Sequence, residues 1–149
     1  MIETEERMRG IEMGKDEIDD FLYEQGHGIL SLMGCGEAYG VPMSFGYDGD
    51  RIFMNLITFG DESKKVDYIT DTEHVSLTAY HVETRLKWKS TVVNGMLEEV
   101  TDDKYAKEVL DDNALFPTLY PPTEPMSDVT RVAIQIEEMT GRKGEEYQS

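Results

Sequence analysis

The chain has 149 residues, a length typical of one domain and sufficient to bury a sizeable core. Its 31 acidic and 14 basic residues give a net charge of −17, which excludes an electrostatic grip on a phosphate backbone and argues against a nucleic-acid partner. No apolar run is long enough for a membrane span, and residues 1–14 lack the apolar segment of a secretory signal, so we expect a cytoplasmic protein without a membrane anchor. The single cysteine, Cys35, excludes an internal disulfide and a zinc module.

The first part of the chain predicts one helix and one strand. Residues 1–14 are polar and weakly periodic, which predicts a flexible lead-in. Residues 15–24 have acids in the first turn and apolar residues at i, i+3 and i+4, which is typical of a short amphipathic helix. Its expected buried side chains are Ile18, Phe21 and Leu22. Glycines then end the helix, and the apolar run at 29–33 predicts a buried strand.

A hairpin is predicted around Asp48, Gly49 and Asp50. An Asp-Gly centre between two apolar segments is a strong signal for a tight turn. Residues 38–47 and 51–57 are therefore expected to be antiparallel neighbours.

The middle of the chain predicts a helix followed by two strands. Residues 60–62 can cap a helix with Val66 and Ile69 on its buried side. Alternating residues at 73–82 and β-branched residues at 88–97 then predict strands, with a bend at Gly95 in the second of them.

The last part predicts a helix, an irregular crossover and a final strand. Thr101, followed by two Asp, starts a helix that ends near Asn113. Its buried face is expected to carry Ala106, Val109 and Leu110. Prolines mark residues 117–125 as irregular, and alternation at 131–139 predicts a strand. About six strands and three short helices without strand–helix alternation indicate a mainly β, small antiparallel barrel.

The acidic residues are spread over the whole chain instead of forming a tail. An even coat of charge favours a solubility adaptation, such as that of a protein from a salt-rich cytoplasm, in which salt screens the repulsion. The alternative is a surface that binds a basic partner.

The three histidines, His27, His74 and His81, do not predict a metal site. His74 and His81 fall on opposite faces of one predicted strand, so they cannot share an ion. The sequence also shows no Ser, His and Asp pattern of a hydrolase.

The most promising site signal is the trio Ser63, Lys64 and Lys65 at a predicted helix start. Free backbone N–H groups, a hydroxyl and two ammonium groups could hold a phosphate dianion there. Alternatively, the lysines neutralise the acids on either side of them. Trp88 and Ser90 form a second aromatic and hydroxyl group, although a Trp is more often part of a core.

The order of segments resembles a known family. The segments, which span residues 17–142, are GILSL, AYGVPMSFGYDGDRIFMNL, SKKVDYI, HVSLTAYHVE, WKSTVVNGMLEEV and VAIQIEEMTGR. This order is similar to that of the pyridoxamine 5′-phosphate oxidase-like flavin-binding proteins, particularly their nitroimidazole-resistance-like branch. The resemblance implies a single domain over residues 1–149, built as a six-stranded antiparallel split β-barrel with Greek-key-like topology and a tail at 143–149. It also implies a homodimer with FMN at the subunit interface.

The resemblance implies roles for several groups of residues. One strand would run beside the isoalloxazine ring, the next would line the cofactor, the lysines would bind the phosphate, and residues of a later strand would complete the site. These residues are, in order, Val41, Pro42, Met43, Ser44 and Phe45; Met54 and Asn55; Ser63, Lys64 and Lys65; Trp88 and Ser90.

We therefore expect an FMN-dependent oxidoreductase that acts on a small molecule. The chain lacks the basic residues and Arg-rich C-terminal motif of true pyridoxamine phosphate oxidases, and the histidine of the nitroimidazole-resistance branch, so the substrate stays open. The alternatives are a non-catalytic module that binds flavin, deazaflavin or haem, and an acidic interaction protein.

Overall fold

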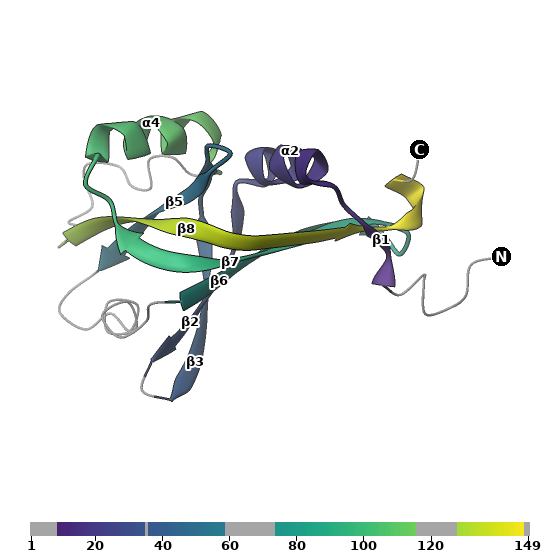
Figure 1. The fold of residues 1–149 in the computed structure, drawn as a ribbon, viewed down its shortest axis with the longest axis horizontal. Coiled ribbons are helices and arrows are strands. Elements are labelled where there is room, and N and C mark those ends of the chain that lie inside the picture. The colour runs from purple at the N-terminus through teal and green to yellow at the C-terminus, as the bar shows by residue number, and fades with distance from the viewer. Residues whose placement is uncertain (1–8, 35, 59–73, 116–127, 148–149) are drawn as a thin grey trace.

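A curled antiparallel sheet forms most of the molecule. The computed structural model describes residues 9–34, 36–58, 74–115 and 128–147. Figure 1 shows the helices α2 (Lys15–Gln25) and α4 (Asp103–Asn113) on one side of the long strands, while the β2–β3 hairpin extends away on the other side. No helix in the described part is long and apolar enough to cross a membrane.

Six long strands and two very short ones make up this sheet. They are β1 (Ile11–Glu12), β2 (His27–Gly34), β3 (Glu37–Ser44), β4 (Gly46–Tyr47), β5 (Arg51–Thr58), β6 (His74–Thr84), β7 (Lys87–Glu99) and β8 (Asp128–Lys143). Their order is β3-β2-β6-β7-β8-β5-β4, and β1 also pairs with β8. All pairs are antiparallel, so the prediction of a mainly β antiparallel fold is confirmed. The predicted six strands correspond to the long ones. The count becomes eight because β1 and β4 are two additional strands of two residues each.

The two predicted helices that fall within the described residues are confirmed. Ile18, Phe21 and Leu22 of α2 are buried, and Gly26 ends the helix with φ +66°, a conformation that costs glycine little. In α4 the cap is Asp102, whose carboxylate accepts the backbone N–H of Tyr105 at 3.2 Å. The helix predicted after residue 60 and the crossover at 117–125 lie outside the described residues.

The expected flexible lead-in at 1–14 is wrong for its last residues. Ile11 and Glu12 pair with Lys143 and Arg142 of β8. Met13 is 4% exposed and its N–H donates to the Gly141 carbonyl at 2.8 Å. The expected tail is also partly docked, because residues 145–147 form a 3-10 turn (Glu145–Tyr147) on β7. Residues 11 and 12 are held by strand pairing, and residues 144 and 146 by backbone hydrogen bonds to Trp88 and Leu86, contacts that a weakly periodic sequence does not reveal.

The predicted pairing of 38–47 with 51–57 is correct only at Gly46 and Tyr47. These two residues pair with Phe53 and Ile52, whereas β3 pairs along its whole length with β2. The chain therefore changes sheet edge at Phe45. Alternation in a sequence predicts which side chains face inward, but it does not identify the neighbouring strand.

The turn predicted at residues 48–50 is confirmed. Gly49 has φ +93°, and Asp48 Oδ1 accepts the N–H groups of Asp50 and Arg51 at 2.9 and 2.7 Å. The Tyr105 hydroxyl of α4 donates to Asp48 Oδ2 at 2.6 Å. Burial opposes ionisation of Asp48, but the hydrogen bonds from Tyr105, Arg51 and Asp50 outweigh it and lower its pKa below the usual 3.8.

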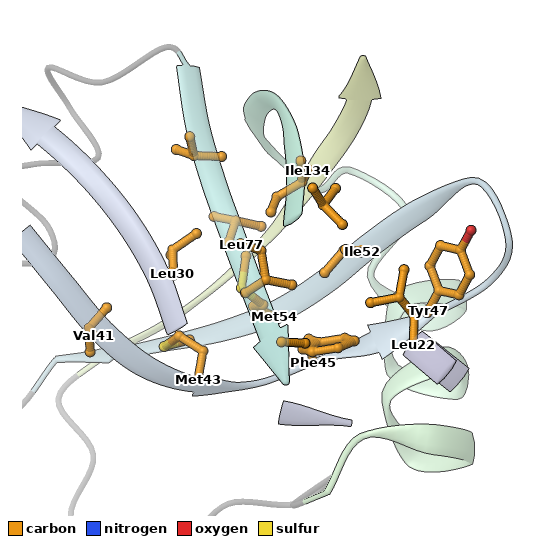
Figure 2. Packing of buried hydrophobic residues seen from close by; sticks show 14 of the residues in the cluster. Leu22, Leu30, Val41, Met43, Phe45, Tyr47, Ile52, Met54, Leu77 and Ile134 are labelled. Carbon is orange, nitrogen blue, oxygen red and sulfur yellow. The ribbon is translucent and has the colours of Figure 1, made fainter. Parts of the chain in front are cut away.

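The core lies on both faces of β5 and β8. Ile52, Met54, Val132 and Ile134 point into the curl of the sheet, where they join α2 and the inner side chains of β2, β3 and β6. Figure 2 shows these side chains converging, with Phe45 and Tyr47 between the strands and α2. The alternate residues Phe53 and Ala133 pack beneath α4 with Ala106, Val109 and Leu110. The predicted buried face of the second helix is thus confirmed.

Gly95 lies at an irregularity where β7 and β8 change register, as its predicted bend implies. Asn94 pairs with Glu138, whereas Gly95 pairs with Ile136, so Glu137 is an extra residue in β8. A Cβ atom at Gly95 would collide with the Gln135 carbonyl oxygen. Glycine is therefore required at this position by the close approach of β8.

Replacing Asp48 by Ala should destabilise the protein by about 2 kcal/mol at neutral pH, because two backbone donors and one phenol lose their acceptor. A carboxylate whose pKa is lowered by folding stabilises the native state above its usual pKa and loses this effect as the pH falls through the folded value. The stability difference between wild type and Asp48→Ala in urea should therefore shrink below pH 3.8. The exposed neighbour Asp50→Ala is the control. Equal stability of Asp48→Ala and wild type at neutral pH would contradict this expectation.

Replacing Thr91 by Val should stabilise the protein by about 1 kcal/mol. Thr91 is 1% exposed, on β7 between Ala79 and Gly141, and its hydroxyl has no hydrogen-bond partner among the residues that the structure describes. Valine keeps the branched shape and removes the unsatisfied group. Thermal unfolding should show a raised midpoint for Thr91→Val and a lowered one for Thr91→Ser, which keeps the hydroxyl but loses a methyl group. A lowered midpoint for Thr91→Val would disprove the account.

Candidate functional site

Two unpaired strand edges approach each other on the open side of the sheet. β3 pairs with β2 over residues 37–44 and has no second partner in the described part of the chain. Among the described strands, β5 pairs with β8, and its other edge pairs with β4 at Ile52 and Phe53. Because β3 and β5 lie close together, the β3 edge over residues 40–44 and the β5 edge beyond Phe53 form a line with no strand ladder between them in the described part of the chain. We call this line the seam.

Four of the predicted cofactor residues at the seam have buried side chains. Val41, Met43, Phe45 and Met54 all belong to the core inside the curl (Figure 2). They bring the expected strands together, but their side chains pack against the core. They can contribute to a site mainly through their backbone groups.

The other three predicted residues at the seam point to the outer face. Pro42 is exposed, and Ser44 and Asn55 are half-buried. Pro42 and Ser44 alternate with the inward Val41 and Met43, and Asn55 follows the inward Met54. The structure therefore places these three side chains on the same face, on the two sides of the seam.

Asn55 is held by a charged neighbour that the sequence did not indicate. Arg131 Nε donates to Asn55 Oδ1 at 3.1 Å, and the same guanidinium forms a close ion pair with Asp103 at the start of α4. Arg131 is the cross-strand partner of Asn55 in the β5–β8 pair. Only the register shows this pairing, because the two residues lie far apart in the sequence.

Trp88 and Ser90 lie away from the seam within one chain. They pair with Val82 and Tyr80 of β6, and strands β2 and β6 separate them from β3. The Trp88 ring packs closely over Gly10 and Gly144. Ser63, Lys64 and Lys65 lie outside the described residues, so their role in phosphate binding stays a prediction.

The outer face of the sheet around the seam carries no acidic or basic side chains over the middle of β2, β3, β6 and β7, whereas His27, His74 and Glu98 lie at the margin of this area. The outward positions within it are Ile29, Ser31, Met33, Ala38, Gly40, Pro42, Ser44, Ser76, Thr78, Tyr80, Val82, Trp88, Ser90, Val92 and Asn94. We call this surface the uncharged face. Tyr80 and Val82 on it are 58% and 61% exposed. In a chain of net charge −17 such a surface is conspicuous.

The histidines do not come together in the structure. His27 Nδ1 lies 2.8 Å from the Gln25 carbonyl, and His74 lies 3.6 Å from Glu137. His81 is exposed on the face of β6 opposite to His74. Within the described ranges there is no group of three His, Cys, Asp or Glu that could hold a metal ion.

A curled, mostly antiparallel sheet with an open seam and two covering helices has the architecture of a split β-barrel. The family model described as pyridoxamine 5′-phosphate oxidase matches residues 14–143. The chain therefore belongs to this family, as its segment order predicts. A comparison with curated protein sequences finds no match.

Three solved structures illustrate the similarity. A FAD-binding protein from Mesorhizobium loti has a TM-score of 0.70 and 23% identity, and the match covers 89% of this chain and 96% of that one. A candidate 5-nitroimidazole antibiotic resistance protein from Bacteroides thetaiotaomicron has a TM-score of 0.65 and 19% identity, with 88% and 85% covered. A heme-binding protein from Mycobacterium smegmatis has a TM-score of 0.69 and 14% identity, with 91% and 55% covered. At these identities the similarity shows a shared fold.

Proposed function

We propose that this protein binds FMN along the seam and acts as a flavin-dependent oxidoreductase on a small molecule. The observation that carries the proposal is the pair of unpaired strand edges beside the uncharged face. Free backbone groups on an ordered strand are normally covered or paired. Here they include the strand that the resemblance to the family assigns to the isoalloxazine ring.

The groups at the seam fit the chemistry of a flavin ring. The polar edge of isoalloxazine has two carbonyl oxygens and an N–H group, and a strand edge offers both N–H donors and C=O acceptors. The rest of the ring is flat and apolar, which suits the uncharged face. The bound flavin would supply hydride transfer, whereas the protein would supply binding, orientation and electrostatics.

The phosphate of FMN would bind Ser63, Lys64 and Lys65, as the resemblance implies. A phosphate dianion needs cationic partners in a chain of net charge −17. The two adjacent lysines at a predicted helix start meet that need.

The uncharged face supports a homodimer. Two copies with a charge of −17 repel each other, and they can associate most readily through surfaces that lack charge. Trp88 and Ser90 are on this face but away from the seam of their own chain. In a dimer formed through the face, the partner could place the same residues near the seam and so complete the site.

A non-catalytic binding module is the second candidate. It is favoured by the heme-binding protein that shares this fold, and none of the seven predicted cofactor residues at the seam is an acid or a base. Turnover of the bound flavin with NADH or NADPH distinguishes an enzyme from such a module.

FMN binding is tested by fluorescence titration of the purified protein. Wild type should quench FMN fluorescence and acquire a yellow colour. Lys64→Ala with Lys65→Ala should weaken FMN binding about hundredfold or more, because charge-assisted hydrogen bonds contribute about 1.5 to 3 kcal/mol each. Riboflavin binding should change little, because riboflavin has no phosphate.

The matched control is Lys104→Ala with Lys107→Ala, which removes the same charge from the exposed surface of α4. A wild-type protein that takes up neither FMN nor riboflavin would refute the proposed function. Equal effects of the two double substitutions would refute only the phosphate role.

The dimer is tested by analytical ultracentrifugation at low and high salt. Wild type should sediment with twice the 17.0 kDa of one chain. Tyr80→Glu with Val82→Glu should give monomers, because two charges would be buried in each half of the interface. Leu115→Glu, which adds a charge at another exposed apolar residue, is the control. A monomeric wild type at every salt concentration would exclude the dimer.

A further inference from the structure

A chain of three polar side chains ends at the seam. Asp103, the first residue of α4, forms an ion pair with Arg131 of β8, and Arg131 donates from Nε to Asn55 Oδ1 of β5 at 3.1 Å. The Arg131 side chain is only 21% exposed. Its backbone carbonyl also accepts the Val100 N–H at 3.0 Å, which fixes the chain just before α4. Arg131 is therefore held through both its guanidinium and its backbone.

The contact with Arg131 defines the orientation of the Asn55 amide. A guanidinium has only donors, so the Asn55 atom that faces it must be the carbonyl oxygen and not the nitrogen. Because the amide is planar and Oδ1 points toward β8, Nδ2 points away from β8. The neighbour of β5 on that side is the seam. No acceptor in the described part of the chain is paired with Nδ2.

We propose that Asp103 and Arg131 are positioning residues that hold Asn55 with its N–H₂ group directed toward the ligand of the seam. This arrangement favours a planar ligand with a carbonyl acceptor at its edge, such as the flavin or deazaflavin ring. The ligand identity rests on the proposed function, whereas the orientation of Asn55 rests on its contacts alone.

The arrangement explains why a charged residue is half-buried beside a predicted cofactor residue. A carboxamide rotates between two nearly isosteric orientations, and without a fixed partner it would offer oxygen as readily as nitrogen. A site that requires a donor gains affinity when the donor is oriented before binding. A ligand that offers a donor at this position would place its own N–H group against the N–H₂ group of Asn55. Such a ligand would therefore bind weakly.

The decisive substitution is Asn55→Asp. The carboxylate keeps the shape of Asn55 and its contact with Arg131, so the fold should persist, but it cannot donate an N–H group. The probe is lumiflavin, which has no phosphate or ribityl chain. Asn55→Asp should weaken lumiflavin binding about tenfold, the effect of one lost hydrogen bond of about 1.4 kcal/mol.

The control for the added negative charge is Gln135→Glu, the same amide-to-carboxylate change at an exposed position of β8 outside the uncharged face. It should bind lumiflavin like wild type. Lumiflavin binding by Asn55→Asp equal to that of wild type would overturn the role of the Asn55 donor.

The positioning role is tested by Arg131→Ala and Arg131→Lys. The control is Arg51→Ala, which removes another cation near the seam, one that forms an ion pair with Glu98 of β7. The side-chain amide signals of Asn55 in NMR spectra should be fixed in wild type and in Arg51→Ala. They should shift toward averaged values in Arg131→Ala, and Arg131→Lys should restore them in part. The midpoint potential of bound FMN should change in the same order, which a merely structural role would not produce.

The two proposals fail in different ways. A wild type that binds no flavin refutes the proposed function and the ligand selection, while the NMR comparison in the ligand-free protein still decides the orientation. Asn55 signals that are the same in wild type and Arg131→Ala would refute the positioning role, even if FMN binds tightly.

Discussion

The architecture depends on the carbonyl oxygen of Gly26. It accepts the N–H of Phe45 at 2.9 Å and the N–H of Leu115 at 3.0 Å, so one atom joins the end of α2, the chain after β3 and the chain after α4. Gly26 can present this carbonyl because its φ of +66° turns the chain out of the helix, and a Cβ atom would meet the backbone of Asn113 and Leu115. Tyr47, two residues after Phe45, donates its N–H to the Asn113 side chain, and this side chain donates in turn to the Tyr47 carbonyl. These bonds fix the point at which the chain leaves one edge of the sheet and joins the other.

The seam follows from this crossing. Once Phe45 has turned away from β2, only Gly46 and Tyr47 remain to pair with β5, and the hairpin ends at Asp48. The remaining edges of β3 and β5 face each other without a complete ladder. Natural sheets usually protect such edges with charges, prolines or covering elements. From residue 38 to residue 44 and at Met54 and Asn55 the side chains beside these edges are uncharged, even though acids are spread over the sequence, which is consistent with the proposal that a ligand or a second copy covers the edges.

Features set by neighbouring residues could be predicted from the sequence, and features set by strand register could not. The helix at 15–24, the turn at Asp48 and the bend at Gly95 depend on capping, on φ > 0 and on close packing, which leave a local pattern. The partner of β3 left no such pattern, because alternation fixes the face of a strand and not its neighbour. The same distinction applies to the site. Resemblance to the family indicated Asn55, but Arg131 becomes relevant only through the β5–β8 register, which no periodicity reveals.

The charge of the chain also limits how a flavin can be recognised. Salt screens the acids over about 8 Å at physiological ionic strength, so an anionic ligand is repelled mainly when it is already close to the surface. In the proposed complex the neutral backbone donors of the seam and the Asn55 amide would attract the ring at that range without adding a charge, and the uncharged face would avoid repulsion. Arg131 is consistent with this logic, because its charge is neutralised by Asp103 and it orients a neutral donor. Recognition of the ring by hydrogen bonds and burial can therefore coexist with an acidic coat, and positive charge is needed only where the phosphate binds.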